Sequence, residues 1–411
     1  QHRPTPQAVA AVAESMGDVL ELNAQFDRAG DSLRLARRMC ADPGAQVRLM
    51  RKEGVIRERQ GKYTQALRWY GRGLSSTGEL EARAAKAEEG ELSLAYAGVR
   101  FRQGKLLDTL DWAHRAERLA REIDDPQMLA HASYLLMIGY GVLRRPEVVK
   151  YRELPLRLFE ELGDLVGQAN VLNNLGVEAH DESRWSEALD YYERSRLARD
   201  EAGDVIGAAT AANNIAEILS DQGHLEDAEV LFDQALRAWR RAGYEVGVAV
   251  GTAYLGRLNA RRGDYDDARV MLADAVERFE RIGASHFVLE TKAYQLECEV
   301  LAGNGRAAIA DIEPLFEMAE ELGDPLLEAV LLRAKGWAHL IEREYEQVEE
   351  LANRCVILSE SVGSLYEAAL ALIMRGQALR ATGRDRTEDH RRARELLTEL
   401  GVVSLPRRAG A

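Results

Sequence analysis

Small and apolar residues recur along this chain at helical spacing, in segments separated by short polar breaks. One segment carries Leu172, Leu175 and Gly176, and the next carries Ala188 and Tyr192. Residues three or four apart share one face of a helix, so the pattern predicts pairs of helices packed face to face. The same arrangement recurs at Ala216, Ala228 and Phe232, and at Gly256, Ala268 and Leu272.

Glycines mark the boundaries of these pairs at one constant interval, at Gly163, Gly203, Gly243, Gly283, Gly323 and Gly363. Glycine adopts the left-handed conformation after a last helical turn without steric cost. Asp164 and Asp204 follow two of them and are expected to cap the next helix through the carboxylate. A second series divides each unit at Gly223, Gly263, Gly303 and Gly383, with Ser183 and Arg343 in the same register. We therefore predict two helices of about 17 residues in every unit, each about 25 Å long.

A fixed period of about 40 residues is typical of solenoids built from stacked helical hairpins. We expect an all-α, right-handed superhelical solenoid of about ten antiparallel hairpins, forming a single domain over residues 1–411. The expected hairpins are 8–42, 46–76, 80–123, 126–162, 164–203, 204–243, 244–283, 284–323, 324–363 and 364–400, and residues 401–411 are expected to form a tail.

The spacing of Gly176, Ala188 and Tyr192 resembles the tetratricopeptide repeat, which has a small residue in its first helix and an alanine and an aromatic in its second. The usual repeat has about 34 residues, so these hairpins are longer than the standard. Matches are strongest in 46–76 and across 164–283, and weaken from 284 to 363. The resemblance implies a module that binds a protein or a peptide in the concave groove lined by the first helices.

In that family, fixed positions of the first helix line the groove, and three units of this chain have residues at the matching positions. They give the candidate peptide-binding residues Asn173, Val177, His180, Asp181, Asn213, Glu217, Asp221, Arg257 and Arg261. An asparagine amide both donates and accepts, so it can hold a peptide backbone of any sequence. In the Asn173–Asn174 and Asn213–Asn214 pairs, one amide is expected to do this and the other to join neighbouring helices.

Four further residues are weaker candidates. Arg48, Arg51 and Arg102 form a modest basic cluster that would hold an acidic peptide, or would simply be a solvated face. Trp337 follows a small residue on a first helix and would face either the concave side or the core.

Two segments carry a narrower resemblance. RKEGVIRERQGKY at 51–63 with ALRWY at 66–70, and ARELLTELGV at 393–402, resemble the C-terminal repeat region of actinobacterial multidomain regulators that join a nucleotide cyclase to an AAA-type ATPase. This resemblance implies a regulatory arm of a larger signalling protein. The alternative is a small-molecule-sensing superhelix of a bacterial regulator. The chain starts at Gln1, without Met, so we expect it to be a piece of a longer protein.

Composition and motifs also argue against several classes of function. The net charge of −14 opposes nucleic-acid binding, which needs a basic surface. No apolar run approaches the roughly 20 residues that cross a bilayer, so no membrane association is expected. Three scattered cysteines favour a reducing cytoplasm. The sequence contains no motif for a nucleotide-binding loop, a set of metal ligands or a catalytic nucleophile. We therefore expect no enzyme activity, no metal and no cofactor in this chain. The oligomeric state stays open.

Overall fold

The structure is a computed structural model that describes residues 5–23 and 25–406, and over these ranges it consists of helices joined by short turns, without strands. The expected all-helical solenoid is confirmed. The chain divides into two compact units, residues 1–171 and 172–411, and the boundary falls within one helix, α10. That all hairpins form one continuous superhelix stays a prediction.

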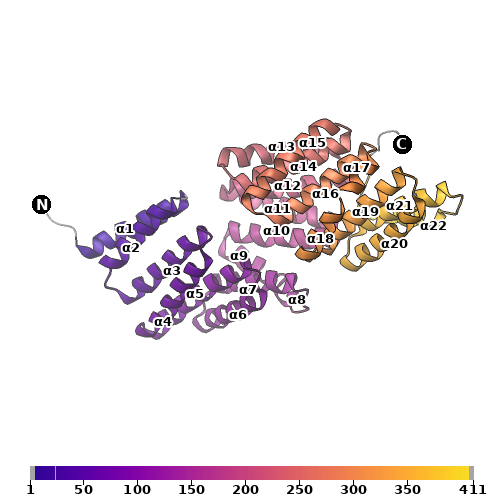
Figure 1. Cartoon of the computed structure of the whole chain (residues 1–411). Coiled ribbons are helices and arrows are strands. Elements are labelled where there is room, and N and C mark those ends of the chain that lie inside the picture. Colours follow the sequence, from indigo (N-terminus) through magenta and orange to yellow (C-terminus); the bar gives the residue numbers. More distant parts are fainter. Residues whose placement is uncertain (1–4, 24, 407–411) are drawn as a thin grey trace. The chain divides into compact units, whose positions relative to one another are not determined.

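Helices follow one another as antiparallel pairs in chain order (Figure 1). Unit 1 contains α1 (Pro6–Leu22), α2 (Phe26–Met39), α3 (Pro43–Arg59), α4 (Tyr63–Ser76), the short 3₁₀ helix η1 (Thr77–Glu79), α5 (Ala82–Arg102), α6 (Leu106–Ile123), α7 (Pro126–Val142), α8 (Val148–Tyr151) and α9 (Leu154–Leu162). After α10 (Leu165–Asp181), unit 2 contains α11 (Trp185–Ala202), α12 (Val205–Gln222), α13 (Leu225–Ala242), α14 (Glu245–Arg262), α15 (Tyr265–Ile282), α16 (Ser285–Leu301), α17 (Gly305–Ala310), α18 (Glu313–Leu322), α19 (Pro325–Ile341), α20 (Tyr345–Val362), α21 (Leu365–Ala381) and α22 (Thr387–Glu399).

The helix boundaries are made by the residues that the periodicity singled out. The six glycines from Gly163 to Gly363 have φ between 65° and 81°, the left-handed conformation that ends a helix. The Asp164 carboxylate accepts from the Gly167 N–H at 2.8 Å, and Asp204 accepts from the Gly207 N–H at 2.9 Å. Local chemistry therefore sets the length of each hairpin.

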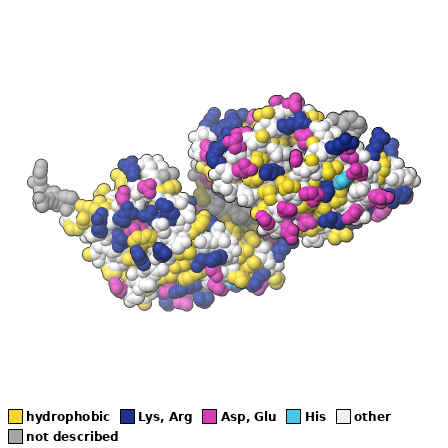
Figure 2. All heavy atoms as spheres, in the orientation of Figure 1, with side chains coloured by type: hydrophobic (Ala, Val, Ile, Leu, Met, Phe, Trp, Pro, Cys, Tyr) yellow, Lys and Arg dark blue, Asp and Glu magenta, His cyan; other side chains and the backbone are white. Residues whose placement is uncertain are grey.

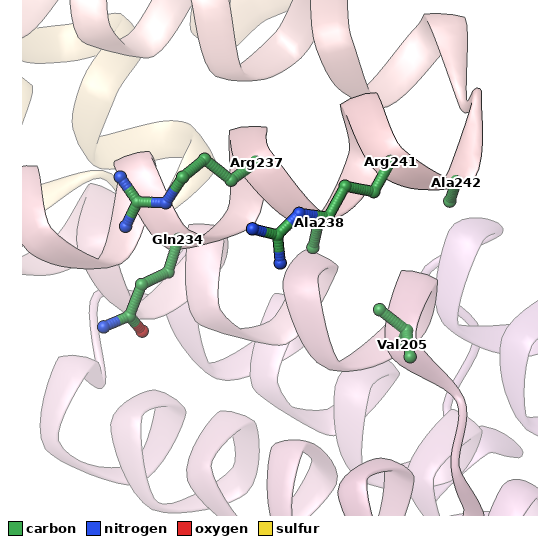
Figure 3. Close-up of a pocket in the computed structure, with 6 residues that line it drawn as sticks. All are labelled: Val205, Gln234, Arg237, Ala238, Arg241 and Ala242. Atoms are coloured by element: carbon green, nitrogen blue, oxygen red, sulfur yellow. The ribbon is translucent and has the colours of Figure 1, made fainter.

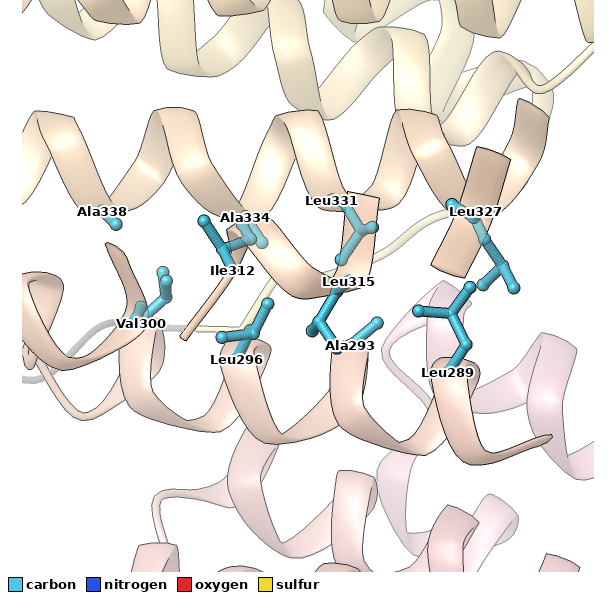
Figure 4. Packing of buried hydrophobic residues seen from close by; sticks show 12 residues of the cluster. Leu289, Ala293, Leu296, Val300, Ile312, Leu315, Leu327, Leu331, Ala334 and Ala338 are labelled. Atoms are coloured by element: carbon cyan, nitrogen blue, oxygen red, sulfur yellow. The ribbon is translucent and has the colours of Figure 1, made fainter. Parts of the chain in front are cut away.

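The small residues of the first helices let the second helices approach closely. A Cβ atom built on Gly176 would lie 2.5 Å from a ring carbon of Tyr192, closer than atoms can pack. Between neighbouring hairpins, aliphatic side chains fill the space. Figure 4 shows Leu289 and Leu296 of α16 facing Leu327 and Leu331 of α19 in one buried cluster.

Two of the second helices are each divided in two, where one unbroken helix was expected. In the hairpin at 126–162 the second helix is divided into α8 and α9, and in the hairpin at 284–323 it is divided into α17 and α18. Pro155 and Pro314 stand in the first turn of α9 and α18. Proline lacks an N–H and fits the first turn of a helix but not its interior, so each proline starts a new helix. The prediction of unbroken helices was wrong at these two places.

Among the described helices, none is both long enough and apolar enough to cross a bilayer. Side chains of both charges are spread over the visible face of the molecule, as Figure 2 shows.

Candidate ligand-binding site

Unit 2 closes on itself through contacts between turns that are far apart in the sequence. The Ser183 hydroxyl, in the α10–α11 turn, donates to the Gly363 carbonyl at 2.8 Å and accepts from the Leu365 N–H at 2.8 Å. Ser183 has φ of 59°, a left-handed conformation that is uncommon for serine. These bonds join the turn of the first hairpin of unit 2 to the turn that precedes the last one.

The segment after α22 completes the closure. The Val403 N–H donates to the Gln222 carbonyl at 2.8 Å, and the Gln222 side-chain amide donates to the Leu400 carbonyl at 2.8 Å. Residues 401–406 of the predicted tail therefore pack on the α12–α13 turn, which the tail prediction did not anticipate. Residues 407–411 of that prediction lie outside the described residues.

A cavity of about 120 Å³ lies inside this closed arrangement. Side chains from six first helices, α10, α12, α14, α16, α19 and α21, converge on it. Five of the nine groove residues predicted from the sequence line it, namely His180, Asp181, Glu217, Asp221 and Arg257. Other lining residues include Trp185, Glu290, Tyr294, Tyr366 and Glu367.

Buried arginines and carboxylates form an ionic network beside the cavity. Asp221 lies 3.3 Å from Arg257 and 2.5 Å from Arg261. Glu297 bridges the same two arginines at 3.2 and 3.0 Å. Burial alone would raise the pKa of Asp221, but the two guanidinium groups hold it below its usual value. Arginine and carboxylate charges are therefore matched in this network, as buried ions require.

A further buried pair extends the network. Arg333 contacts Glu367 at 2.5 Å, and both side chains are buried. With it, the network holds three guanidinium groups and three carboxylates. Nearby, burial lowers the pKa of His180, which keeps the imidazole neutral at pH 7.

Two carboxylates at the cavity stand apart from the network. The Glu290 carboxylate accepts from the Tyr294 hydroxyl at 2.5 Å and from the Tyr254 hydroxyl at 3.4 Å. No ion pair joins Glu217 or Glu290 to a basic side chain within residues 5–23 and 25–406. Burial, together with the Glu290 and Asp221 charges, raises the pKa of Glu217 to about 8.

The asparagines take different places. The Asn214 side-chain amide donates to the Asn173 side-chain oxygen at 3.3 Å, so this pair joins neighbouring first helices. Asn213 is 3% exposed, and its side-chain oxygen has no hydrogen-bond partner in the described part of the chain. Val177 is 39% exposed. Of the two Asn173/Asn213 candidates, only Asn213 keeps an unused acceptor.

Trp337 lines a second interior cavity, of about 440 Å³. Its walls include Leu370 and Ile373 of α21, with Leu405 and Pro406 from the segment after α22. Arg333 and Gln377 are polar groups on the same walls.

The basic candidates of unit 1 are engaged within the chain. Arg48 pairs with Glu14 at 3.0 Å, Arg51 pairs with Glu91 at 3.1 Å, and Arg102 contacts Glu58. Each of these charges is paired with a carboxylate of another helix, and binding of an acidic peptide here stays a prediction.

Another hollow, of about 440 Å³, lies between Val205 of α12 and the residues of α13 that Figure 3 shows. Its charged lining residues are Arg237 and Arg241, and the residues singled out by the sequence lie elsewhere.

Several residues of the interior site were missed by reasoning from the sequence. Glu297 and Arg333 occupy groove registers in the two units with weak motifs, so extending the register would have found them. Nothing in the local pattern of Glu290 or Tyr366 signals their place at the cavity. They reach it through the closure of unit 2.

The arrangement is suited to binding. Within the described residues, no three His, Cys, Asp or Glu side chains are placed to hold a metal ion. Carboxylates and aromatic rings instead surround a small volume, as in sites that recognise a polar ligand.

Comparison with known proteins supports the fold. The Tetratricopeptide repeat family model matches residues 207–281. No curated protein matches the sequence. A crystal structure of a Rap protein complexed with Competence and Sporulation Factor is similar, with a TM-score of 0.64 and 16% identity, covering 87% of this chain and 99% of that chain.

Two other solved structures are similar over most of this chain. Aspartyl phosphate phosphatase F from Bacillus subtilis has a TM-score of 0.55 and 12% identity, covering 90% of this chain and 97% of that chain. A signal transduction ATPase with numerous domains from Pyrococcus horikoshii, which has a tetratricopeptide repeat sensor, has a TM-score of 0.56 and 15% identity, covering 90% of this chain and 55% of that chain. The chain therefore has the all-helical fold of tetratricopeptide-repeat solenoids, and its residues 207–281 match that repeat family directly.

Proposed function

We propose that this chain is a binding module that takes a short peptide, or an extended segment of a protein, into the interior of unit 2. The observation that carries the proposal is the convergence of His180, Asp181, Glu217, Asp221 and Arg257 on one cavity. Enclosure by six helices gives a ligand many contacts at small cost, because the walls are largely preformed.

The proposed biological role is that of a regulatory arm in a larger signalling protein of the cyclase or ATPase type, acting in the cytoplasm. One protein of similar fold is solved with Competence and Sporulation Factor, and another carries such repeats as a sensor. At 16% and 15% identity these likenesses establish the fold alone, so the role rests on the interior site.

Peptide selection tests the proposal. A phage-displayed library of random short peptides is panned on the 411-residue chain, and the enriched peptides are titrated against wild type, His180→Ala and Arg237→Ala. His180 lines the cavity, whereas Arg237 lies in the hollow on α13. We expect His180→Ala to weaken binding about tenfold, as loss of one hydrogen bond does, and Arg237→Ala to leave it unchanged.

Circular dichroism spectra and melting curves show whether both variants keep the fold. Peptides that bind folded His180→Ala as tightly as wild type, or a selection without enrichment, would contradict an interior peptide site.

A second candidate function is small-molecule sensing, favoured by the cavity of about 440 Å³ beside Trp337. Its mostly apolar walls and few polar groups match the composition of ligand pockets. A compound screen by thermal shift tests it, because a ligand that binds only the folded state raises the melting temperature. Stabilisation that disappears in Trp337→Ala would support this function.

A further inference from the structure

Charge is unevenly distributed around the cavity of about 120 Å³. The arginines Arg257, Arg261 and Arg333 are matched by the carboxylates of Asp221, Glu297 and Glu367. Glu217 and Glu290 remain as two acidic groups at one cavity without a basic partner in the described part of the chain. Both side chains are partly exposed, and an ionised group removed from much of the surrounding water is costly unless a counter-charge meets it.

Glu217 and Glu290 line the same cavity, and the Glu290 charge helps to raise the pKa of Glu217. Asn213, Glu217 and Asp221 follow one another at intervals of four residues, so they share one face of α12. Asn213 is only 3% exposed and is not among the residues that line the cavity, so the acceptors that reach the cavity from this face are the Glu217 and Asp221 carboxylates.

Aromatic rings complete the walls. Trp185 and Tyr366 line the cavity with ring centroids 5.3 Å apart, and Tyr294 already carries the Arg257 guanidinium over its ring at 4.6 Å. Aromatic faces attract cations, most strongly where water is excluded. The volume exceeds that of a single water, so a group of several non-hydrogen atoms fits.

We propose that this cavity binds an organic cation, the guanidinium or ammonium group of the ligand, between the carboxylates of Glu217 and Glu290. The inference rests on the proposed function, since it names the chemistry that the interior site recognises. A metal ion is the less suitable occupant, because no group of three ligands is placed for one within the described residues. The carboxylate oxygens of Glu217 and Glu290 match the several N–H donors of a guanidinium.

Binding is expected to be coupled to proton release. With the pKa of Glu217 raised to about 8, its carboxyl is mostly protonated at pH 7 in the empty site. A bound cation favours the ionised form, so affinity rises with pH up to about 8, by at most about tenfold per unit.

Five groups face Glu217. They are Tyr192 of α11, Tyr254 and Arg257 of α14, Glu290 of α16 and Asp221 on its own helix. The tyrosines stay neutral because burial raises their pKa, Arg257 stays charged, and Asp221 stays ionised because its pKa is lowered.

The test uses the 411-residue chain and short blocked peptides. Acetyl-Gly-Arg-Gly-amide is compared with the same peptide carrying citrulline, which is nearly isosteric and neutral, and with its lysine counterpart. Agmatine carries the guanidinium without a peptide backbone and separates a peptide source from a small-molecule source. Isothermal titration calorimetry at several pH values, in buffers of different ionisation enthalpy, measures affinity and proton release.

We expect the arginine or lysine peptide, or agmatine, to bind at least about tenfold more tightly than the citrulline peptide, since hydrogen bonds between charged groups are the stronger ones. Glu290→Gln keeps an acceptor for Tyr294 and is expected to lose most of this preference. Glu217→Gln is expected to abolish the proton release. Glu226→Gln makes the same charge change at an exposed position of α13 and serves as the matched control.

Equal affinity for the arginine and citrulline peptides, or no binding by any of the cations, overturns the inference. A preference for cations that survives in both Glu217→Gln and Glu290→Gln overturns it as well. Failure of the proposed function gives a different result, because in that case binding of the selected peptides does not depend on His180. Selected peptides whose binding depends on His180 but not on a basic residue of the peptide support the interior site and contradict only the cation.

Discussion

Two glycines in the same register of different repeats permit a controlled test of hairpin packing. Gly176 in α10 faces Tyr192, and a Cβ atom would lie 2.5 Å from its ring. Gly376 in α21 stands five repeat lengths later, and a Cβ atom there would meet nothing nearer than 3.8 Å. The perturbation is glycine to alanine at each position.

Both substitutions gain about 1 kcal/mol from the better helix propensity of alanine. Only Gly176→Ala also forces a well-packed ring to move, because Tyr192 is 3% exposed. Overpacking of this kind costs about 1–3 kcal/mol. The propensity term cancels between the two variants, so their stabilities are expected to differ by about 1–3 kcal/mol.

Hydrogen exchange read by mass spectrometry is the suitable assay, since a long repeat array need not unfold in one step. The hydrogen-exchange protection of each variant is divided by that of wild type. This ratio is expected to be roughly 5- to 150-fold lower for the α10–α11 peptides of Gly176→Ala than for the α21–α22 peptides of Gly376→Ala. Adding Tyr192→Ala removes the ring and is expected to relieve the extra cost, which a double-mutant cycle measures. Equal gains in protection at both sites would refute the close approach of α10 and α11.

Three other outcomes follow from single contacts. Asp125→Ala removes the carboxylate that accepts from the Met128 N–H at 2.9 Å, and is expected to cost about 1 kcal/mol, seen as faster exchange at the start of α7. Ser183→Ala deletes both bonds that join the α10–α11 and α20–α21 turns, and faster exchange is expected at the Leu365 amide; unchanged exchange would mean that other contacts hold the closure. For Glu217, the folded-state pKa is raised from 4.5 to about 8, so its contribution to stability is present below pH 4.5 and is lost as the pH rises to 8. Glu217→Gln is therefore expected to match wild type at pH 4.5 and to be more stable at pH 8 in thermal melts, and a variant less stable at pH 8 would contradict the raised pKa.

Much of the fold could be predicted from the sequence because it depends on local chemistry. The glycines end helices and Asp164 and Asp204 begin them through bonds that span only a few residues. The facing of Gly176 and Tyr192 also follows from helical periodicity within one hairpin. The two broken helices were missed because the prediction rested on the glycine period and the apolar spacing, and did not use Pro155 and Pro314.

The site could be predicted only in part. The groove register placed five residues at the cavity because each first helix repeats the same orientation. It also selected Arg257 and Arg261, whose charges are taken up by Asp221 and Glu297 of the neighbouring repeats. The position of a residue within the repeat does not show whether its charge is available to a ligand or is already paired with a residue of the next repeat.

The sequence by itself determined the helices, their pairing and the face that each turns inward, since caps and apolar spacing act over a few residues. Only the tertiary structure decided that unit 2 closes, through Ser183 and Gly363 and through Gln222 and Leu400. These contacts join positions that are very distant in the sequence and depend on the summed rotation of every hairpin between them. That closure turns a row of repeated polar residues into an enclosed cavity, in which three arginines are neutralised and Glu217 and Glu290 are not.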